Sequence, residues 1–238
     1  MNDDTVTEPY YDAEGVTLYH GDALDVLPTI DLHGCVDACV TDPPYLIGAA
    51  SAGSISSKTG TWADAMNASL WFSTWYRLVD RALRHEGLFW SFLNWRTLPI
   101  VMRAAIDARL PITSVAVWDK EWIGPGGSQG LRPSYEMVAL MAQSGAAITD
   151  RGVADVIRVK VGGYKPHGHP AEKPVAVVRR VLEISGLEPG ALVLDPFIGS
   201  GTTAVACREL GLRCVGIDAD EQWLETAVRR LDQAVLPL

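Results

Sequence analysis

The sequence predicts an α/β protein with a doubly wound, mostly parallel sheet of seven strands, one of them antiparallel. Short apolar runs of strand length alternate with longer helical stretches along nearly the whole chain, which is typical of strand–helix–strand units. Two of these runs end in an Asp-Pro pair, and proline cannot continue a hydrogen-bonded strand. One step between strands lacks a helix, which predicts an antiparallel hairpin at an edge of the sheet.

Each element is predicted from its apolar pattern and from the turn residues that bound it. We expect strands at residues 16–19, 36–41, 88–93, 113–118, 134–142, 191–195 and 213–217. We expect helices at about 66–84, 96–109, 173–185, 202–210 and 220–232. The hairpin joins strands 113–118 and 134–142. Trp71, Trp75, Trp90 and Trp118 fall on apolar positions of these elements, so we predict that they lie in the core.

The composition indicates a single domain over residues 1–238, with 48% hydrophobic residues and therefore a substantial core. No apolar run is long enough to span a membrane. Residues 1–12 are polar and acidic and lack the layout of a signal peptide, which predicts a flexible terminus and a cytoplasmic protein. The four cysteines form no CxxC pair, so we expect buried thiols and no metal site.

The most informative motif is Asp42-Pro43-Pro44-Tyr45, which follows the apolar run Val36–Val40. In open α/β sheets, ligands bind at the carboxyl ends of the strands. The Asp42 carboxylate and the Pro43 carbonyl are hydrogen-bond acceptors, so together they suit a flat amine with two N–H bonds. Tyr45 offers a face for a planar ring. The alternative interpretation is an ordinary turn at the end of a strand.

A second motif, Asp195-Pro196-Phe197-Ile198-Gly199-Ser200-Gly201-Thr202-Thr203, lies between a predicted strand and a predicted helix. Its glycines let a ligand approach the backbone, and the start of the helix presents free N–H groups. The next strand, 213–217, ends at Asp218. An acid at that position commonly binds ribose hydroxyls, and the alternative is an N-cap of the following helix.

Together these motifs resemble those of the DNA methyltransferases that methylate exocyclic amines with S-adenosylmethionine. The catalytic motif precedes the cofactor motif, an order similar to the circularly permuted, beta-type branch of that family. His169-Pro170-Ala171-Glu172-Lys173-Pro174 resembles the segment that closes over the methionine end of the cofactor. Gly21-Asp22-Ala23-Leu24 resembles the motif for the adenine ring of the cofactor. The resemblance implies a Rossmann-like methyltransferase fold in circularly permuted order.

The resemblance also implies an activity, the transfer of a methyl group from S-adenosylmethionine to N6 of a flipped-out adenine at specific DNA sites. The residues it implies for catalysis are Asp42, Pro43, Pro44 and Tyr45. The residues it implies for cofactor binding are Asp22, Lys173, Asp195, Phe197, Gly199, Gly201, Thr202 and Asp218. Asp at the first position of the catalytic motif resembles adenine-modifying members, and N4 of cytosine is the alternative target.

The net charge of −9 is unfavourable for a protein that binds phosphates, but the charge is unevenly distributed. Residues 151–180 hold seven basic and two acidic residues, compatible with contact to double-stranded DNA or with a solvated surface. Segments 48–62, 121–132 and 146–169 do not fit a packed core and are candidate DNA-facing loops. The candidate DNA-binding residues are Lys58, Arg132, Tyr135, Arg158, Lys160 and Lys165. The resemblance is compatible with a homodimer, which would ease the charge problem.

Two other classes of function remain compatible with these residues. Gly199, Gly201 and Ala204 fit the GxGxxG/A pattern of a dinucleotide-dependent oxidoreductase, although that pattern usually opens a fold. The small recognition region suggests a catalytically idle DNA-binding regulator, and the intact catalytic motif argues against it. Trp62 and Trp122 lie in or beside the candidate loops, where they either stack on bases or anchor the loop.

Overall fold

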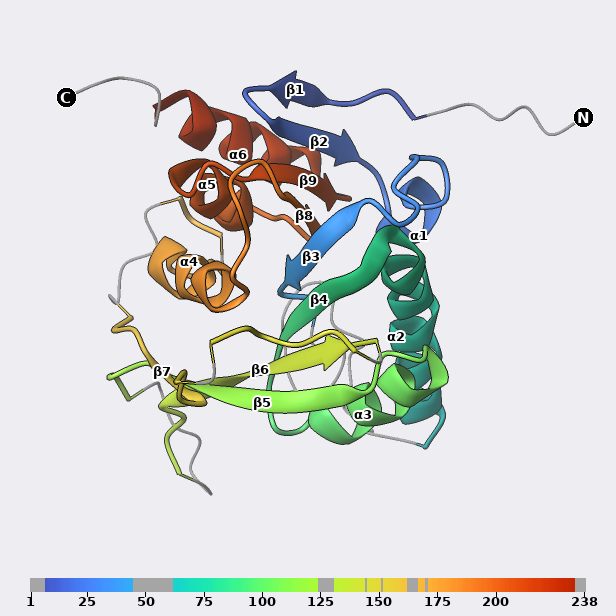
Figure 1. The fold of residues 1–238 in the computed structure, drawn as a ribbon, viewed down its shortest axis with the longest axis vertical. Coiled ribbons are helices and arrows are strands. Elements are labelled where there is room, and N and C mark those ends of the chain that lie inside the picture. The colour runs from blue at the N-terminus through green and yellow to red at the C-terminus, as the bar shows by residue number, and fades with distance from the viewer. Residues whose placement is uncertain are drawn as a thin grey trace, which may run out of the picture.

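The structure is a computed structural model that describes residues 7–44, 62–123, 131–143, 145–150, 152–161, 167–169 and 171–233. The helices of this part of the chain are α1 (Ala23–Val26), α2 (Trp62–Ala82), α3 (Leu98–Asp107), α4 (Val175–Ile184), α5 (Thr202–Glu209) and α6 (Glu221–Gln233). Its strands are β1 (Tyr11–Ala13), β2 (Val16–His20), β3 (Val36–Thr41), β4 (Leu83–Leu93), β5 (Ile112–Asp119), β6 (Tyr135–Ala142), β7 (Val156–Arg158), β8 (Leu192–Asp195) and β9 (Arg213–Asp218). They form one sheet in the order β1-β2-β9-β8-β3-β4-β6-β5-β7 (Figure 1).

The directions of the strands confirm the predicted α/β class. From β2 through β9, β8 and β3 to β4, every neighbouring pair is parallel. β6 runs antiparallel between β4 and β5, so the predicted hairpin and its reversed strand are present. The described residues form nine strands rather than the predicted seven, because β1 and β7 add three-residue strands at the two edges. Runs of three residues are too short to show a periodic pattern in sequence.

Both edge strands lie in segments that the sequence assigned to irregular structure. β1 pairs antiparallel with β2, so at Tyr11 and Asp12 the structure differs from the predicted flexible terminus 1–12. β7 pairs with the end of β5 and lies inside the predicted loop 146–169. β7 also places the β5–β6 hairpin one strand in from the edge at which it was predicted.

Helices cover both faces of the sheet, as a doubly wound fold requires (Figure 1). Buried side chains of α4, α5 and α6 belong to one core with Val40 of β3, whereas those of α1, α2 and α3 belong to a second core with Cys39. Successive residues of a strand point to opposite faces, so β3 contributes to both cores. Trp75, Trp90 and Trp118 are buried, as predicted.

The cysteines only partly follow the prediction. Cys39, Cys207 and Cys214 are buried free thiols, whereas Cys35 is exposed, because it lies in the turn before β3 enters the core. The described residues contain no group of His, Cys, Asp and Glu side chains that could hold a metal ion. Within the same ranges, no helix is both long and apolar enough to cross a membrane.

The path of the chain changes direction between β3 and β8. After β3 the chain adds β4 on one side, and after β8 it adds β9 on the other side. The two strands are direct neighbours, with Ala38 paired to Val193 and Cys39 paired to Leu194. In open α/β sheets, the crevice outside the carboxyl ends of two such strands is where ligands bind. This edge therefore carries the candidate site.

Candidate active site

The motifs predicted from the sequence meet at this edge of the sheet. Asp42 follows the last residue of β3, Asp195 ends β8, and Asp218 ends β9. The hydroxyl of Thr41 donates a hydrogen bond of 2.6 Å to Asp195 Oδ1, which joins the catalytic motif to the glycine-rich loop. β2 pairs in parallel with β9, which brings Asp22 to the same edge.

The carboxylate of Asp195 organises the glycine-rich loop. Its Oδ1 accepts hydrogen bonds from Thr41 Oγ1 at 2.6 Å and from the Phe197 backbone N–H at 3.1 Å. Its Oδ2 accepts a hydrogen bond from Thr203 Oγ1 at 2.6 Å. Burial raises the pKa of Asp195 to about 6, although the hydrogen bonds from Thr203 and Thr41 act to lower it. Both carboxylate oxygens therefore accept hydrogen bonds from groups within the protein, and these bonds fix the loop to β3 and α5.

Asp218 holds the loop from its other side. Its Oδ2 accepts a hydrogen bond from the Gly199 N–H at 2.8 Å, and its Oδ1 accepts one from the Asp220 N–H at 2.9 Å. Burial raises the pKa of Asp218 above its ordinary value. The alternative prediction, that Asp218 caps the following helix, does not match the structure. The helix α6 begins at Glu221, and Asp220 accepts the hydrogen bond from the Gln222 N–H.

Gly201 sets the spacing between the loop and α6. Its φ of +82° lies in the left-handed region, and a Cβ at this position would lie 2.7 Å from Ala227 Cβ. Arg230, three residues further along α6, donates hydrogen bonds to Ser200 O at 2.7 Å and to Thr202 Oγ1 at 3.2 Å. Arg230 is buried and was not predicted as part of the site. A charged residue on the apolar face of an amphipathic helix is the sequence signal that would have found it.

The segment before α4 lies against the same loop. The carbonyl oxygen of Lys173 accepts a hydrogen bond from Thr202 Oγ1 at 3.2 Å. A Cβ on Gly199 would lie 3.4 Å from His169 Nε2, and His169 packs edge-to-face on Trp223 with 4.5 Å between ring centroids. This segment therefore lies beside the loop, and its predicted closure over the cofactor stays a prediction.

The side chain of Lys173 contacts the catalytic motif. Its Nζ donates a hydrogen bond to Asp42 Oδ2 and lies 3.2 Å from Glu136 Oε2. The other oxygen of Glu136, Oε1, lies 2.6 Å from Lys120 Nζ. Burial lowers the pKa of Lys173, but the carboxylates of Asp42 and Glu136 outweigh it and raise that pKa above its ordinary value. For Glu136, burial raises the pKa, and Lys173 and Lys120 together bring it below its ordinary value.

Lys120 and Glu136 were not predicted as site residues. Glu136 pairs with Trp118 across the β5–β6 hairpin. Lys120 lies two residues after Trp118, so Lys120 and Glu136 are diagonal neighbours across the two strands. A diagonal pair of opposite charges in a predicted hairpin is a signal present in the sequence. Its meeting with Asp42 and Lys173 depends on the order of the strands, which no local pattern shows.

Two residues predicted to bind the cofactor have structural partners nearby. Asp22 is exposed and caps α1, and its Oδ1 accepts a hydrogen bond from the Leu24 N–H at 2.8 Å. Phe197 packs against Trp71 and Trp75 of α2, with ring centroids 5.5 and 5.1 Å apart. Phe197 therefore anchors the loop on the core at the α2 face of the sheet.

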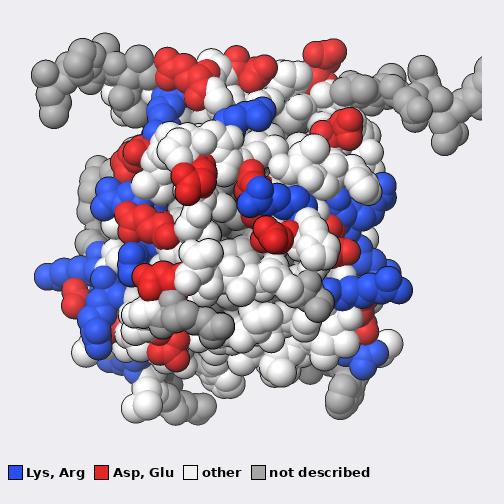
Figure 2. Space-filling view, in the orientation of Figure 1, with Lys and Arg blue, Asp and Glu red and all other residues white. Residues whose placement is uncertain are grey.

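The predicted DNA-binding residues that the structure describes lie on the surface. Arg132 is exposed and donates a hydrogen bond to Ile123 O at 3.2 Å, which ties together the two sides of the hairpin tip. Tyr135 is 42% exposed. Arg158 and Lys160 are exposed at and after the end of β7. Figure 2 shows Lys and Arg side chains beside β7 and α4, with Asp and Glu side chains among them.

Part of the predicted site falls outside the described residues. This applies to Tyr45, Lys58 and Lys165, and to the predicted loop 48–62 apart from Trp62, which begins α2. Their predicted roles stay predictions. Of the two prolines that follow Asp42, the first is buried and the second is exposed. Trp122, predicted beside a DNA-facing loop, is 43% exposed.

Comparison with known proteins finds similarity over most of the chain. The family model described as DNA methylase, which covers N6 and N4 methyltransferases, matches residues 36–229. YubD of Escherichia coli (strain K12), which is named as a methylase, is 30% identical over 89% of this chain and 88% of its own length. The DNA adenine methyltransferase YhdJ of the same organism is 25% identical over 93% of this chain and 84% of its own length.

Solved structures share the fold. The M1.HpyAVI–SAM complex superimposes with a TM-score of 0.73 at 21% identity, over 91% of this chain and 99% of that chain. The cytosine-N4-specific PvuII DNA methyltransferase superimposes with a TM-score of 0.77 at 14% identity, over 94% of this chain and 89% of that chain. These likenesses confirm the predicted Rossmann-like methyltransferase fold.

Proposed function

The chain belongs to the DNA methylase family, and from that premise we propose that it transfers a methyl group from S-adenosylmethionine to N6 of adenine in double-stranded DNA. Family membership confirms the resemblance that the motifs carry. It argues against the alternative function of a dinucleotide-dependent oxidoreductase. One observation carries the proposal. Thr41, the residue before Asp42, donates a hydrogen bond of 2.6 Å to Asp195, so the catalytic motif lies directly beside the glycine-rich loop.

The residues around this loop fit S-adenosylmethionine, which supplies an electrophilic methyl group. Gly199 has a positive φ of 51° and no side chain to fill the space in front of His169. Asp218 and Asp22, at the ends of neighbouring strands, offer carboxylate oxygens to ribose hydroxyls and to an adenine amine, because each oxygen accepts more than one hydrogen bond. The likeness in fold to a protein solved as its SAM complex supports this assignment.

Asp42 and the carbonyl of Pro43 accept the two N–H bonds of the target amine. The lone pair of this amine is delocalised into the ring, and holding both N–H bonds favours a pyramidal nitrogen with its lone pair free to attack the methyl group. As the nitrogen–carbon bond forms, the carbon–sulfur bond would break, the neutral thioether would leave and the nitrogen would lose one proton. Most of the acceleration then comes from placement and electrostatics. A base inside a duplex cannot reach a site at the edge of a sheet, so the base is flipped out and stacks on Tyr45.

Adenine is the proposed base because Asp begins the catalytic motif, as in adenine-modifying members that the motif resembles. The relative YhdJ, named as an adenine methyltransferase, supports this choice. N4 of cytosine is the second candidate, because the family covers both amines and the fold is also similar to a cytosine-N4-specific enzyme.

Double-stranded DNA is the proposed partner, bound through the hairpin tip and the basic surface beside β7. Arg132 lies shortly before β6, Tyr135 begins β6, and Arg158 and Lys160 are exposed on that surface. Each lysine or arginine that contacts a phosphate releases a counterion, so binding weakens as salt rises. A homodimer is part of the proposal, and sedimentation equilibrium with and without DNA measures it.

Asp42→Ala tests the proposal directly. Wild type and variant are incubated with plasmid DNA and S-adenosylmethionine, and the digested nucleosides are analysed by mass spectrometry. We expect N6-methyladenine from the wild type and a rate at least about 10³-fold lower from the variant, because the amine loses its main acceptor. Calorimetric titration should show unchanged affinity for S-adenosylmethionine. The matched control is Asp31→Ala, which removes an exposed aspartate and should keep the wild-type rate.

Each other outcome has a distinct meaning. N4-methylcytosine from the wild type would support the second candidate. DNA binding with no methylated base would support the catalytically idle regulator. Full activity in Asp42→Ala would contradict the assignment of this carboxylate.

A further inference from the structure

Four side chains of alternating charge form a charge network that ends at Asp42. Lys120 Nζ lies 2.6 Å from Glu136 Oε1, Glu136 Oε2 lies 3.2 Å from Lys173 Nζ, and Lys173 Nζ donates to Asp42 Oδ2. The residues come from the end of β5, from β6, from the segment before α4 and from the end of β3. This charge network therefore links the β5–β6 hairpin to the catalytic motif.

These charges are largely shielded from water. The side chains of Lys173 and Asp42 are 9% and 20% exposed, and those of Lys120 and Glu136 are each 19% exposed. The Lys173 ammonium also lies 5.4 Å from the centre of the Phe92 ring. Taking paired charges out of water is costly, and apolar residues of the same size often stabilise a protein as well or better. The charge network is therefore better explained by the position that it gives Asp42 than by a gain in protein stability.

We propose that Glu136 is a positioning residue for Asp42, acting through Lys173. This inference rests on the proposed function. Glu136 helps to hold the Lys173 ammonium against Asp42, and that ammonium fixes the orientation of the carboxylate for the target amine. Lys120 holds Glu136 in turn, and Asp195 faces Asp42 from the neighbouring strand β8.

The roles of the two lysines lead to a specific expectation. Without the Glu136 carboxylate, Lys173 loses one of the two acidic groups that fix its position, and Lys120 loses the acidic group that neutralises it. Removing the Lys120 charge as well removes the cation that Glu136 had neutralised, while the contact between Lys173 and Asp42 remains. A second substitution should therefore restore part of what the first one loses.

The experiment compares Glu136→Gln, Lys120→Met and the double variant in methyl-transfer assays on DNA. For Glu136→Gln we expect kcat to fall about 10- to 100-fold, with KM for DNA and the Kd for S-adenosylmethionine within about twofold of wild type. The acid limb of its pH–rate profile should move to lower pH, because the loss of the nearby negative charge favours the ionised form of Asp42. The kcat of the double variant should be at least about threefold higher than that of Glu136→Gln.

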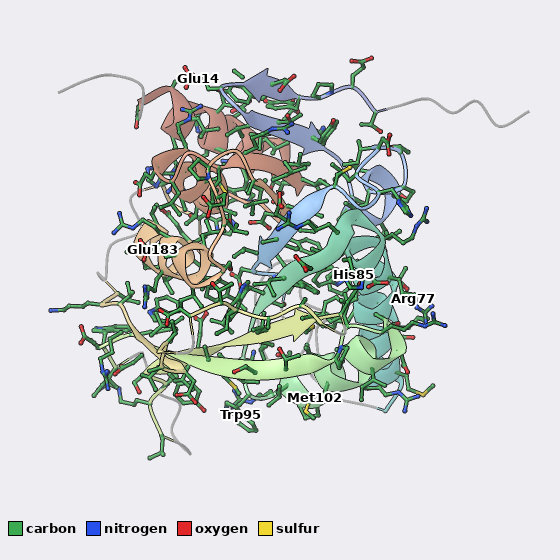
Figure 3. The ribbon with its side chains drawn as sticks, viewed as in Figure 1. Glu14, Arg77, His85, Trp95, Met102 and Glu183 are labelled. Atoms are coloured by element: carbon green, nitrogen blue, oxygen red, sulfur yellow. The ribbon has the colours of Figure 1, made fainter. Side chains whose placement is uncertain are left out.

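The matched control is Glu183→Gln. Glu183 pairs with arginines on the outer surface of α4 (Figure 3), so the same loss of charge there should leave kcat and the pH profile unchanged. If Glu136→Gln does not fold, Glu136→Asp replaces it, because it keeps the charge but withdraws the carboxylate from both lysines. The same fall in kcat is expected there.

Two results would overturn the inference. One is a wild-type kcat and pH profile in Glu136→Gln. The other is a double variant no more active than Glu136→Gln, since loss of packing would not be repaired by removing Lys120. If the wild type itself methylates no base, the proposed function fails, and that outcome is recognisable before any variant is compared.

Discussion

The two halves of the carboxyl edge are held by different kinds of contact. In the loop half, made of residues 195–203 with Asp218, the carboxylates accept hydrogen bonds from hydroxyl and backbone N–H groups. In the catalytic half, made of Asp42, Lys120, Glu136 and Lys173, the carboxylates are paired with ammonium groups. The first arrangement fixes the path of the backbone, and the second fixes a charge.

This difference separates what a substitution in each half should change. A backbone that is fixed by neutral donors presents a constant surface to a cofactor, so changes in the loop half should alter stability and cofactor affinity. A carboxylate that is held by ammonium groups matters most when charge develops at the target amine. Changes in the catalytic half should therefore alter kcat and its pH dependence.

Among the substitutions that test this difference, Lys173→Met should have the largest effect, because it removes the cation in contact with Asp42. We expect kcat to fall about 10²- to 10³-fold, because the carboxylate loses both its orientation and the charge that stabilises its ionised form. The acid limb of the pH–rate profile should move to higher pH. Single-turnover kinetics over a range of pH measures both effects.

The same variant tests where Lys173 belongs. The motif resemblance predicted that this lysine binds the cofactor, whereas its side chain contacts Asp42. An unchanged Kd for S-adenosylmethionine in Lys173→Met would place the side chain in the catalytic half. A Kd weakened about as much as kcat would show that the two halves are not separate at this residue. Lys173→Arg, which keeps the charge, is the control and should retain more activity than Lys173→Met.

The same difference explains how far the sequence could predict the site. The loop half is nearly contiguous, with Asp195, the glycines and Asp218 in one strand–loop–helix–strand unit, so a local motif was enough to predict it. The catalytic half joins Asp42, Lys120, Glu136 and Lys173, whose meeting depends on the order β3-β4-β6-β5. For Lys173 the motif resemblance predicted cofactor binding, whereas the contact of its side chain with Asp42 was not predicted.

The fold shows a similar division. The long apolar strands and the helices that cover them were predicted, because burial imposes a periodic pattern over many residues. β1 and β7 were not predicted, because three-residue strands are held mainly by backbone pairing with a neighbour. Arg230 was not predicted because it donates its hydrogen bond to Ser200 O from α6, a helix that is separate from the loop in sequence.

A smaller effect is expected from Gly201→Ala, which tests whether packing against α6 shapes the loop half. Gly201 and Gly190 have nearly the same positive φ, 82° and 85°, but only Gly201 lacks room for a Cβ, which would lie 2.7 Å from Ala227 Cβ. We expect Gly190→Ala to lower the free energy of unfolding by about 1 kcal/mol through backbone strain alone. Gly201→Ala should lower it by about 2–4 kcal/mol, because overpacking adds to the strain.

Urea denaturation of the two glycine variants measures this difference. In Gly201→Ala the Kd for S-adenosylmethionine should weaken, while the kcat at saturating cofactor should change less than in Lys173→Met. Equal destabilisation of the two variants would show that the contact with Ala227 does not constrain the loop.

The smallest effect concerns Asp195, whose pKa burial raises to about 6. A carboxyl with a raised pKa binds its proton more tightly in the folded state than in the unfolded state. Its contribution therefore favours folding at low pH and is lost as the pH rises through about 6. When the pH falls from about 7.5 to about 5, protonation of Asp195 should raise the free energy of unfolding by about 1 kcal/mol.

Asp195→Asn removes the titration and keeps most of the contacts. The amide oxygen accepts from Thr41 and Phe197, and the amide N–H donates to Thr203, whose hydroxyl turns to accept it. The unfolding free energy of the wild type, relative to this variant, should rise by about 1 kcal/mol on going from about pH 7.5 to about pH 5. A difference that stays constant with pH would mean that the donors around Asp195 hold it ionised despite its burial. The two halves of the edge would then both stabilise charge, one with hydroxyl and amide dipoles and the other with ammonium groups.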